Sequence, residues 1–328
     1  MTPVLYLVIP CYNEEQVLPL TSGKFKAKVD ELVEAGKISD DSRVMFVNDG
    51  SKDTTWDILT SLTEQDKRYA AISLSRNRGH QNALIAGLME AKKFADITIS
   101  MDCDGQDDIN AITEMVDEYA KGNEIVYGVR NDRKTDTWFK RTTAQSYYKF
   151  LRGMGVDIIP DHADYRLMSS RVLDALEGYG EVNLFLRGII PQLGFKQSVV
   201  YYSRAEREAG KTHYPLSKMA SLAIDGVTSF SVRPLRLITV LGFIVAFLSL
   251  VGIIYVLVSV ISGYYVDGWA STTCILCFVS GIQMISLGVI GEYIGKIYLE
   301  TKHRPRYIIS ERTEGAAQTE TEEEKTNA

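Results

Sequence analysis

Asp102 and Asp104, two aspartates separated by one residue, directly follow a run of apolar residues. Four aspartates fall within seven residues here, and carboxylates packed this closely repel one another unless a cation lies among them. Mg²⁺ and Mn²⁺ prefer one or two carboxylates together with phosphate oxygens to a cage made only of protein ligands. The spacing therefore favours a metal–diphosphate site in which Asp104 binds the ion, helped by Asp102 and the amide oxygen of Gln106. Asp107 and Asp108 are expected to be acids in the first turn of the next helix, where the helix dipole favours negative charge. The alternative for the whole run is a solvated loop that leads into that helix.

Short apolar runs alternate with amphipathic stretches through the first 128 residues. The runs predict strands at 4–10, 43–49, 70–75, 97–102 and 124–128, and the stretches predict helices at 17–36, 54–65, 81–94 and 109–122. This alternation predicts an α/β fold with a parallel-rich sheet and right-handed crossovers. Ligands of such sheets bind at the carboxyl ends of the strands. Polar residues follow the first four predicted strands: Asn13 and Glu14, Asn48 and Asp49, Arg76 and Asn77, and Asp102 and Asp104.

Several classes of binding protein are disfavoured by composition and motif. The net charge of −6 and the pI near 5.4 argue against nucleic-acid binding, which usually needs a clustered excess of Lys and Arg. No G-x-G-x-x-G follows the first predicted strand, and no G-x-x-x-x-G-K-[ST] occurs in the sequence. A bound nucleotide must therefore be held in another way, and a metal that bridges its diphosphate would do so.

Two uncharged stretches follow the α/β part of the chain. The first lies between Arg236 and Asp267 and the second runs from Gly268 to Gly291, and each can supply the roughly 20 apolar residues that a bilayer core requires. We expect transmembrane helices at about 236–262 and 269–293. Basic residues precede the first span and follow the second, which places both ends of the hairpin in the cytoplasm. The soluble domain is then cytoplasmic.

Four short motifs precede the two predicted spans: V-I-P-C-Y-N-E-E at 8–15, V-N-D-G-S-K-D at 47–53, D-C-D at 102–104 and D-Y-R-L-M-S at 164–169. In this order the motifs resemble the family 2 glycosyltransferases. Within that family the chain is similar to the polyprenyl-phosphate sugar transferases, namely bactoprenol glucosyltransferases and dolichol-phosphate mannose synthases. The resemblance extends to about Tyr307 and implies a GT-A-type nucleotide-sugar-binding domain.

The resemblance also implies roles for individual residues. The nucleotide-sugar pocket would be lined by Pro10, Tyr12, Glu14, Asn48, Asp49 and Asp102, with Asp49 at the uracil or ribose edge. Asn48 departs from the aspartate that is common at its position, which leaves an amide to make that contact. Asp102, Asp104 and Gln106 match the metal-binding pattern D-x-D-x-Q, with Gly105 in place of a more usual apolar residue.

The catalytic residues implied by the resemblance are Asp104, Asp164 and Arg166, with the last two in the floor of the active site. Asp164 would lie near the sugar or the acceptor, and whether it acts as a base or only positions its neighbours stays open. The alternative is that Asp164 and Arg166 form an ion pair that only shapes the loop. A lipid phosphate acceptor is already anionic near neutral pH, so a strong general base is less necessary than for a hydroxyl acceptor.

An acceptor phosphate needs cations, and the segment before the first span supplies Arg204, Arg207, Lys211 and Lys218. A solvated basic stretch attracted to anionic headgroups is the alternative. Aromatic and basic residues are mixed at about 136–153, which predicts an interfacial helix on the membrane. A second interfacial helix is expected at 215–234.

The motifs and the resemblance together predict a metal-dependent inverting glycosyltransferase that uses Mg²⁺ or Mn²⁺. It would move glucose from UDP-glucose to undecaprenyl phosphate at the cytoplasmic face of a bacterial inner membrane. N-acetylglucosamine, galactose and mannose donors remain open, as does a non-catalytic sugar-nucleotide-binding scaffold, and the resemblance suggests a homotetramer. We expect a catalytic domain at 1–214, the membrane hairpin at 235–299, and a tail at 300–328 that is disordered from about 311.

Overall fold

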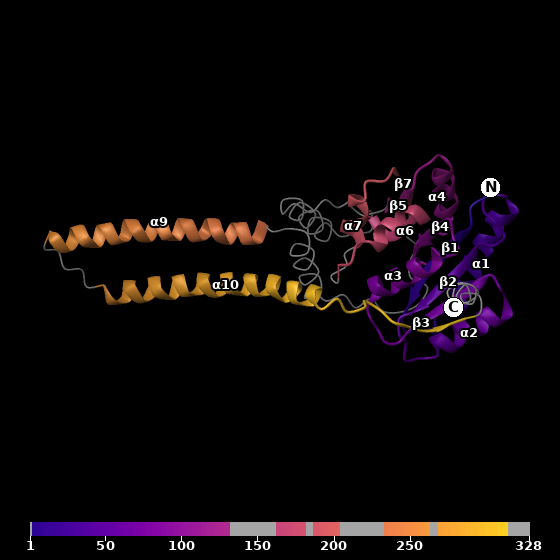
Figure 1. Cartoon of the computed structure of the whole chain (residues 1–328), viewed down its shortest axis with the longest axis horizontal. Helices are drawn as coiled ribbons and strands as arrows, with labels where there is room; N and C mark the ends of the chain where they lie inside the picture. Colours follow the sequence, from indigo (N-terminus) through magenta and orange to yellow (C-terminus); the bar gives the residue numbers. More distant parts are fainter. Residues whose placement is uncertain (1, 132–161, 182–185, 204–232, 263–267, 314–328) are drawn as a thin grey trace, which may run out of the picture. The chain divides into compact units, whose positions relative to one another are not determined.

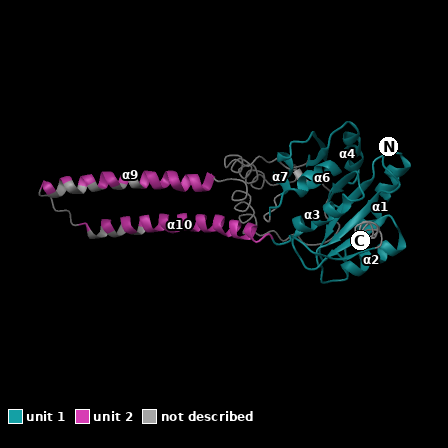
Figure 2. Ribbon diagram, viewed as in Figure 1, with its two compact units in different colours: residues 1–146, 158–214, 304–328 teal, residues 147–157, 215–303 magenta. Residues whose placement is uncertain are grey.

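The computed structural model describes residues 2–131, 162–181, 186–203, 233–262 and 268–313. The chain divides into two compact units, which Figure 2 shows in different colours. The first unit comprises residues 1–146, 158–214 and 304–328, and the second comprises residues 147–157 and 215–303.

Among the described residues of the first unit, eight strands form one mixed sheet in the order β7-β5-β6-β4-β1-β2-β3-β8. The strands are β1 (Leu5–Cys11), β2 (Arg43–Asn48), β3 (Tyr69–Leu74), β4 (Ile97–Ser100), β5 (Ile125–Arg130), β6 (His162–Ser169), β7 (Gln197–Tyr202) and β8 (Ile309–Arg312). The neighbours β4-β1-β2-β3 and the pair β5-β7 are parallel, whereas β6 is antiparallel to β4 and β5, and β8 is antiparallel to β3. The predicted α/β class with a parallel-rich sheet is confirmed.

Helices cover both faces of the sheet (Figure 1). The described helices of this unit are α1 (Leu18–Glu34), α2 (Thr55–Gln65), α3 (His80–Ala91), α4 (Ala111–Ala120), α6 (Ser170–Glu177) and α7 (Leu186–Gln192). Leu7 of β1 belongs to one buried apolar cluster together with Phe25 of α1 and Met115 of α4. On the other face α3 packs closely, because Gly87 leaves no room for a side chain: a Cβ there would lie 2.5 Å from methyl carbons of both Val8 and Val47.

The chain re-enters the first unit after the hairpin as strand β8. Leu74 pairs with Ile309 and Ile72 pairs with Arg312, so β8 forms the edge of the sheet next to β3. The tail that we expected to be disordered from about residue 311 is therefore ordered at its start, because Glu311 and Arg312 complete a strand and Thr313 is buried against Ala71. The rest of that tail, residues 314–328, lies outside the described residues.

The second unit contains two long helices, α9 (Arg233–Ile261) and α10 (Trp269–Thr301). Both are long and apolar enough to cross a membrane, over Arg233–Gly252 and Phe278–Thr301, and neither stretch is buried within the structure. The predicted spans coincide with these helices, although α10 continues to Thr301. The interfacial helices predicted at about 136–153 and 215–234 lie outside the described residues, apart from Arg233 and Pro234, which begin α9.

Candidate active site

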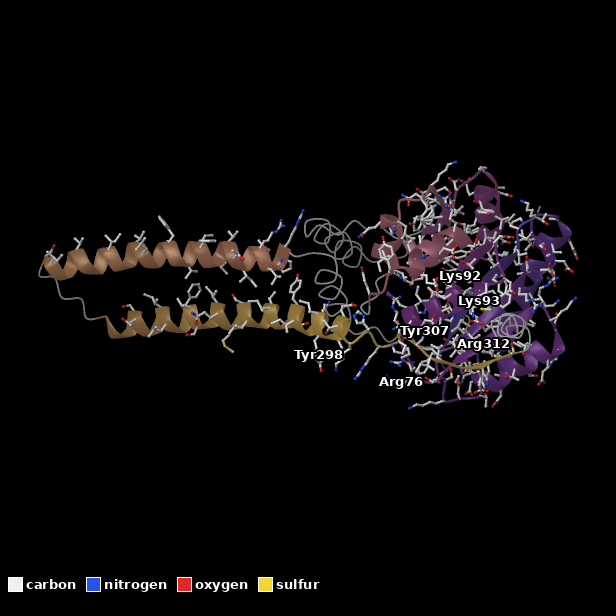
Figure 3. All side chains as sticks on the ribbon, in the orientation of Figure 1. Arg76, Lys92, Lys93, Tyr298, Tyr307 and Arg312 are labelled. Atoms are coloured by element: carbon white, nitrogen blue, oxygen red, sulfur yellow. The ribbon has the colours of Figure 1, made fainter. Side chains whose placement is uncertain are left out.

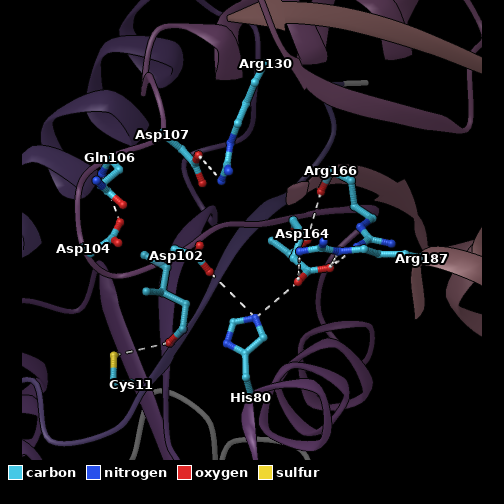
Figure 4. Close-up of polar contacts among 12 residues, drawn as sticks. Cys11, His80, Asp102, Asp104, Gln106, Asp107, Arg130, Asp164, Arg166 and Arg187 are labelled. Carbon is cyan, nitrogen blue, oxygen red and sulfur yellow. Dashed lines mark hydrogen bonds and ion pairs between the residues drawn. The ribbon is translucent and has the colours of Figure 1, made fainter. Parts of the chain in front are cut away.

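The carboxyl ends of β1, β2 and β4 meet at one edge of the sheet, as their parallel pairing requires. Because β6 is antiparallel to β4, the start of β6 reaches the same edge. Ser100, the last residue of β4, donates its hydroxyl to the carbonyl oxygen of Asp164 at 2.5 Å. Asp164 therefore lies beside the loop that carries Asp102 and Asp104, although it follows them by 60 or more positions in sequence (Figure 4).

Asp164 is the centre of a cluster of side-chain contacts. Its Oδ1 accepts a hydrogen bond from Arg166 Nη2 at 2.5 Å, and Arg187 of α7 donates Nη2 to Oδ2 at 3.1 Å and Nε to Oδ1 at 3.3 Å. The Nε2 atom of His80, the first residue of α3, lies 3.6 Å from Asp164 Oδ2 and 3.7 Å from Asp102 Oδ1. Figure 4 shows the imidazole between these two carboxylates. The Asp164–Arg166 pair that we considered as an alternative thus exists, within a larger cluster.

The charges in this cluster shift one another's pKa values. Burial alone would raise the pKa of Asp164, but Arg187, His80 and Arg166 outweigh it and hold that pKa well below the usual range. Burial alone would lower the pKa of His80, but Asp164 and Asp102 raise it above its ordinary value. Asp164 is thus a stable carboxylate beside a histidine that favours its charged form. Such a carboxylate is a poor proton acceptor.

The Asp102–Gln106 loop folds back on itself at Gly105. That residue has a φ of 67°, which glycine adopts without strain, and the backbone N–H of Gln106 donates to Asp104 Oδ1 at 3.1 Å. Burial is the main cause that raises the pKa of Asp102; His80 lowers it, and the charges of Asp107, Asp164 and Asp104 raise it further. The crowded carboxylates are chemically suited to a divalent cation, and the metal site itself stays a prediction from the D-x-D spacing.

The described residues include no group of three or more His, Cys, Asp or Glu side chains arranged to hold a metal ion by themselves. Two aspartates and one amide are a donor set that leaves further coordination positions to phosphate oxygens and water. The residues of this loop therefore fit an ion shared with a substrate diphosphate.

Asp107 differs from its predicted place in the first turn of a helix. It precedes α4, is buried, and accepts a hydrogen bond from the hydroxyl of Tyr202 at 2.6 Å, with Arg130 Nη2 3.6 Å away. These contacts attach the loop that carries Asp102 and Asp104 to the ends of β5 and β7, so Asp107 stabilises the position of that loop. Asp108 stays close to the predicted position, since it accepts the N–H of Asn110, the N-cap residue of α4.

Asn48 and Asp49 are buried and bonded within the protein at the end of β2. The two oxygens of Asp49 accept the backbone N–H groups of Arg78 at 2.7 Å and Gly79 at 2.9 Å. Asn48 donates to Ser73 Oγ at 2.9 Å and accepts the N–H of Ser51 at 3.1 Å. The pair therefore joins the loop after β2 to the loop that leads into α3.

The remaining nucleotide candidates lie around the end of β1. Pro10 is buried in the strand, opposite Val47 of β2, and Tyr12 follows the strand with 41% of its surface exposed. The backbone N–H of Glu14 donates to Thr55 Oγ1 at 2.9 Å. The end of β1 thus presents one exposed aromatic ring and one half-buried carboxylate beside the Asn48–Asp49 pair.

The acceptor-phosphate candidates Arg204, Arg207, Lys211 and Lys218 lie outside the described residues. His80 and Arg187 are site residues that sequence reasoning missed. His80 carried a usable signal, since it begins the helix after a predicted strand, on the edge where ligands bind. Arg187 carried none, because it lies in a short helix remote in sequence from every motif.

Comparisons with known proteins agree along the chain. The model of Glycosyl transferase family 2 matches residues 6–176, and the model of the GtrB C-terminal hairpin matches residues 233–297. The glycosyltransferase YkoT of Bacillus subtilis is 50% identical over 307 residues, which cover 94% of this chain and 91% of the relative. A prophage bactoprenol glucosyl transferase homolog of Escherichia coli K12 is 40% identical over 305 residues, covering 92% of this chain and 97% of the relative. The bactoprenol glucosyl transferase of Shigella phage SfV is 39% identical with the same coverage.

Proposed function

We propose that this chain, which belongs to glycosyltransferase family 2, transfers glucose from UDP-glucose to the phosphate of a polyprenyl carrier. The observation that carries the proposal is the state of Asp164, whose two oxygens are bonded to Arg166 and Arg187. The carboxylate at the centre of the site is poorly suited to remove a proton from a hydroxyl. A phosphate nucleophile, already ionised near neutral pH, needs no such step. The relatives named for bactoprenol glucosyl transfer support the same acceptor and sugar.

On the donor side, Asp102, Asp104 and Gln106 would hold a Mg²⁺ or Mn²⁺ ion. When bound, the ion acts as a Lewis acid and offsets the negative charge that builds on the leaving diphosphate. The chain's own residues do the positioning: Asn48, Asp49, Tyr12 and Glu14 border the nucleoside end, and His80 keeps Asp102 and Asp164 at a fixed separation.

On the acceptor side, we place the lipid phosphate near Arg187 and the basic segment Arg204, Arg207, Lys211 and Lys218. Attack in line behind the anomeric carbon gives inversion and a β-linked product. The hairpin α9–α10 would span the membrane with both ends on the cytoplasmic face, where polyprenyl phosphate and nucleotide sugar meet. The catalytic domain at 1–214 and a homotetrameric assembly belong to the same proposal.

The test is transfer of radiolabel from UDP-glucose into organic-extractable lipid by purified protein with undecaprenyl phosphate and Mn²⁺. UDP-N-acetylglucosamine, UDP-galactose and GDP-mannose are run in parallel. We expect labelled lipid from UDP-glucose, abolished by EDTA and by Asp104→Ala. Asp108→Asn is the matched control, because it alters a carboxylate of the same loop whose contact is with the N-cap of α4.

If another donor labels the lipid, the assignment of glucose as the transferred sugar is wrong, while the assignment of the polyprenyl phosphate acceptor stands. If the Asp104→Ala variant labels lipid at the wild-type rate, Asp104 is not a ligand of a required metal ion. UDP binding with no lipid labelling from any of the four donors would contradict the transfer reaction and favour a sugar-nucleotide-binding scaffold.

A further inference from the structure

Strand β8, which follows the membrane hairpin in sequence, is bonded to residues adjacent to the donor site. Ile308, just before the strand, accepts the backbone N–H of Ser75 at 2.9 Å, and Ser310 donates its hydroxyl to the carbonyl oxygen of Ser73 at 3.0 Å. Ser73 and Ser75 lie at the carboxyl end of β3, where the sheet gives way to the loop before α3. The C-terminal segment is therefore attached at the same edge that carries the candidate active site.

Each of these two serines is connected to a donor-site residue, Ser73 by a hydrogen bond to Asn48 and Ser75 through the loop that binds Asp49. The hydroxyl of Ser73 accepts the side-chain N–H of Asn48, and the loop that starts at Ser75 ends with the two amides that bind Asp49. The same loop lies against Gly50, where a Cβ would be only 2.5 Å from the carbonyl carbon of Arg76. The loop that starts at Ser75 is thus held between Gly50, which follows β2, and Ile308 of the C-terminal segment.

Side chains of β8 add two anchors to neighbouring helices. Arg312 donates Nε to Glu90 of α3 at 2.9 Å, and Glu90 is buried and also pairs with Lys93. Arg312 and Lys93 are labelled in Figure 3. Glu311 accepts the indole N–H of Trp56 in α2 at 3.2 Å. β8 is therefore bonded to β3, to α2, which precedes β3 in the sequence, and to α3, which follows β3.

We propose that β8 is a positioning element of the donor site, which sets the place of Asn48 and of the loop 75–79 by holding Ser73 and Ser75. Only residues 302–308 connect α10 to this strand, so the same segment ties the hairpin covalently to the donor half of the first unit. The inference rests on the assignment of Asn48 and Asp49 to the nucleotide pocket in the proposed function. On this proposal, a strand remote from the nucleotide controls donor affinity.

The experiment compares the full-length wild type with Glu311→Ala/Arg312→Ala, which removes both helix anchors. We expect amide hydrogen exchange at Arg78 and Gly79 to quicken about tenfold, while amides of β1 and β4 exchange as before. The dissociation constant of UDP with Mn²⁺, and the donor KM, should rise about threefold to tenfold, with kcat and the acceptor KM unchanged. Arg312→Lys keeps the charge opposite Glu90 and should restore part of the donor affinity.

Lys92→Ala is the matched control, since it removes the ion pairs of α3 with Asp174 and Glu177 without touching β8. Ser310→Ala, which deletes one hydroxyl, serves if the double variant does not fold, and should show the same changes on a smaller scale. A lower melting temperature with unchanged exchange at 78–79 and unchanged UDP affinity would overturn the proposal. A wild type that binds no UDP would instead refute the proposed function, and the exchange measurement would still decide the role of the strand.

Discussion

Asp49 and Asp164 are both buried carboxylates at the same edge of the sheet, yet the protein holds them by different means. Asp49 bonds to two backbone N–H groups, those of Arg78 and Gly79. Asp164 bonds to charged side chains that come from its own strand and from α7, with His80 close by. The pKa of Asp49 is raised, because burial outweighs the two amides, whereas the pKa of Asp164 is held well below its ordinary value.

The difference separates two kinds of site. Main-chain amides carry no net charge, so Asp49 fixes the shape of a loop while these partners leave its negative charge uncompensated. The cations around Asp164 neutralise it and are in turn neutralised by it, so each depends on the other. We therefore expect changes at Asp49 to alter donor binding and changes around Asp164 to alter both turnover and stability.

Asp164→Asn should have the largest effect. Arg166 has no exposed surface, and without its partner carboxylate it becomes a buried, uncompensated charge, which costs about 3 kcal/mol of unfolding free energy. We expect kcat to fall about a thousandfold through misplacement of His80 and Arg187, while the affinity for UDP changes less than threefold. Steady-state kinetics and thermal melting in detergent give both values. Asp174→Asn, at an exposed carboxylate paired with Lys92, is the control, and equal losses in the two variants would contradict the comparison.

Arg187→Ala should lower kcat about a hundredfold, because it removes the two-point contact with Asp164 from the only partner that α7 supplies among the described residues. Arg187→Lys keeps the charge but cannot reproduce the paired geometry, so we expect it to recover no more than about a tenth of the lost activity. Kinetics at saturating donor and acceptor measure this. Full recovery by lysine would show that charge alone matters at this position.

Much of the fold was predictable because hydrophobic periodicity is a local signal. The first five strands and four helices lie within a few residues of their predicted ranges, and the polar residues that follow the strands do gather at one edge. Strand β8 was not predictable by the same means. Its sequence, Ile-Ile-Ser-Glu-Arg from Ile308, is short and polar, and it becomes a strand because β3 offers an open edge for pairing.

The site was predictable where a motif is contiguous and unpredictable where the fold joins distant segments. The Asp102–Gln106 loop follows β4 at the predicted edge of the sheet, whereas Arg187 reaches Asp164 only through the fold. Asp107 shows the opposite error: its sequence position predicted an acid in the first turn of a helix, but it precedes α4 and accepts the hydroxyl of Tyr202, 95 residues later.

Asp49→Asn tests the backbone-held half of the comparison. One oxygen becomes an NH₂ group, which cannot accept the N–H of Arg78 or Gly79, so one buried amide loses its partner at a cost of about 1–3 kcal/mol. We expect the donor KM to rise about tenfold with kcat unchanged. Asp66→Asn is the control, since that carboxylate also accepts a backbone amide, from Arg68, at the other end of β3. A fall in kcat with an unchanged donor KM would place Asp49 with the catalytic cluster instead.

The two aspartates should also impose opposite pH dependences on the stability of the metal-free protein. The folded pKa of Asp164 is depressed, so its stabilisation is present above the unfolded carboxyl pKa of about 4 and is lost only as the pH falls through the lower folded value. The folded pKa of Asp49 is raised, so its contribution is present below about pH 4 and is lost as the pH rises through the folded value. Once His80 is protonated, and down to about pH 4, melting temperatures in EDTA should therefore show a constant gap between wild type and Asp164→Asn. Over the same pH range, the melting temperature of wild type should rise relative to that of Asp49→Asn as the pH falls. Parallel curves for the two variants would mean that backbone and side-chain partners hold these carboxylates equivalently.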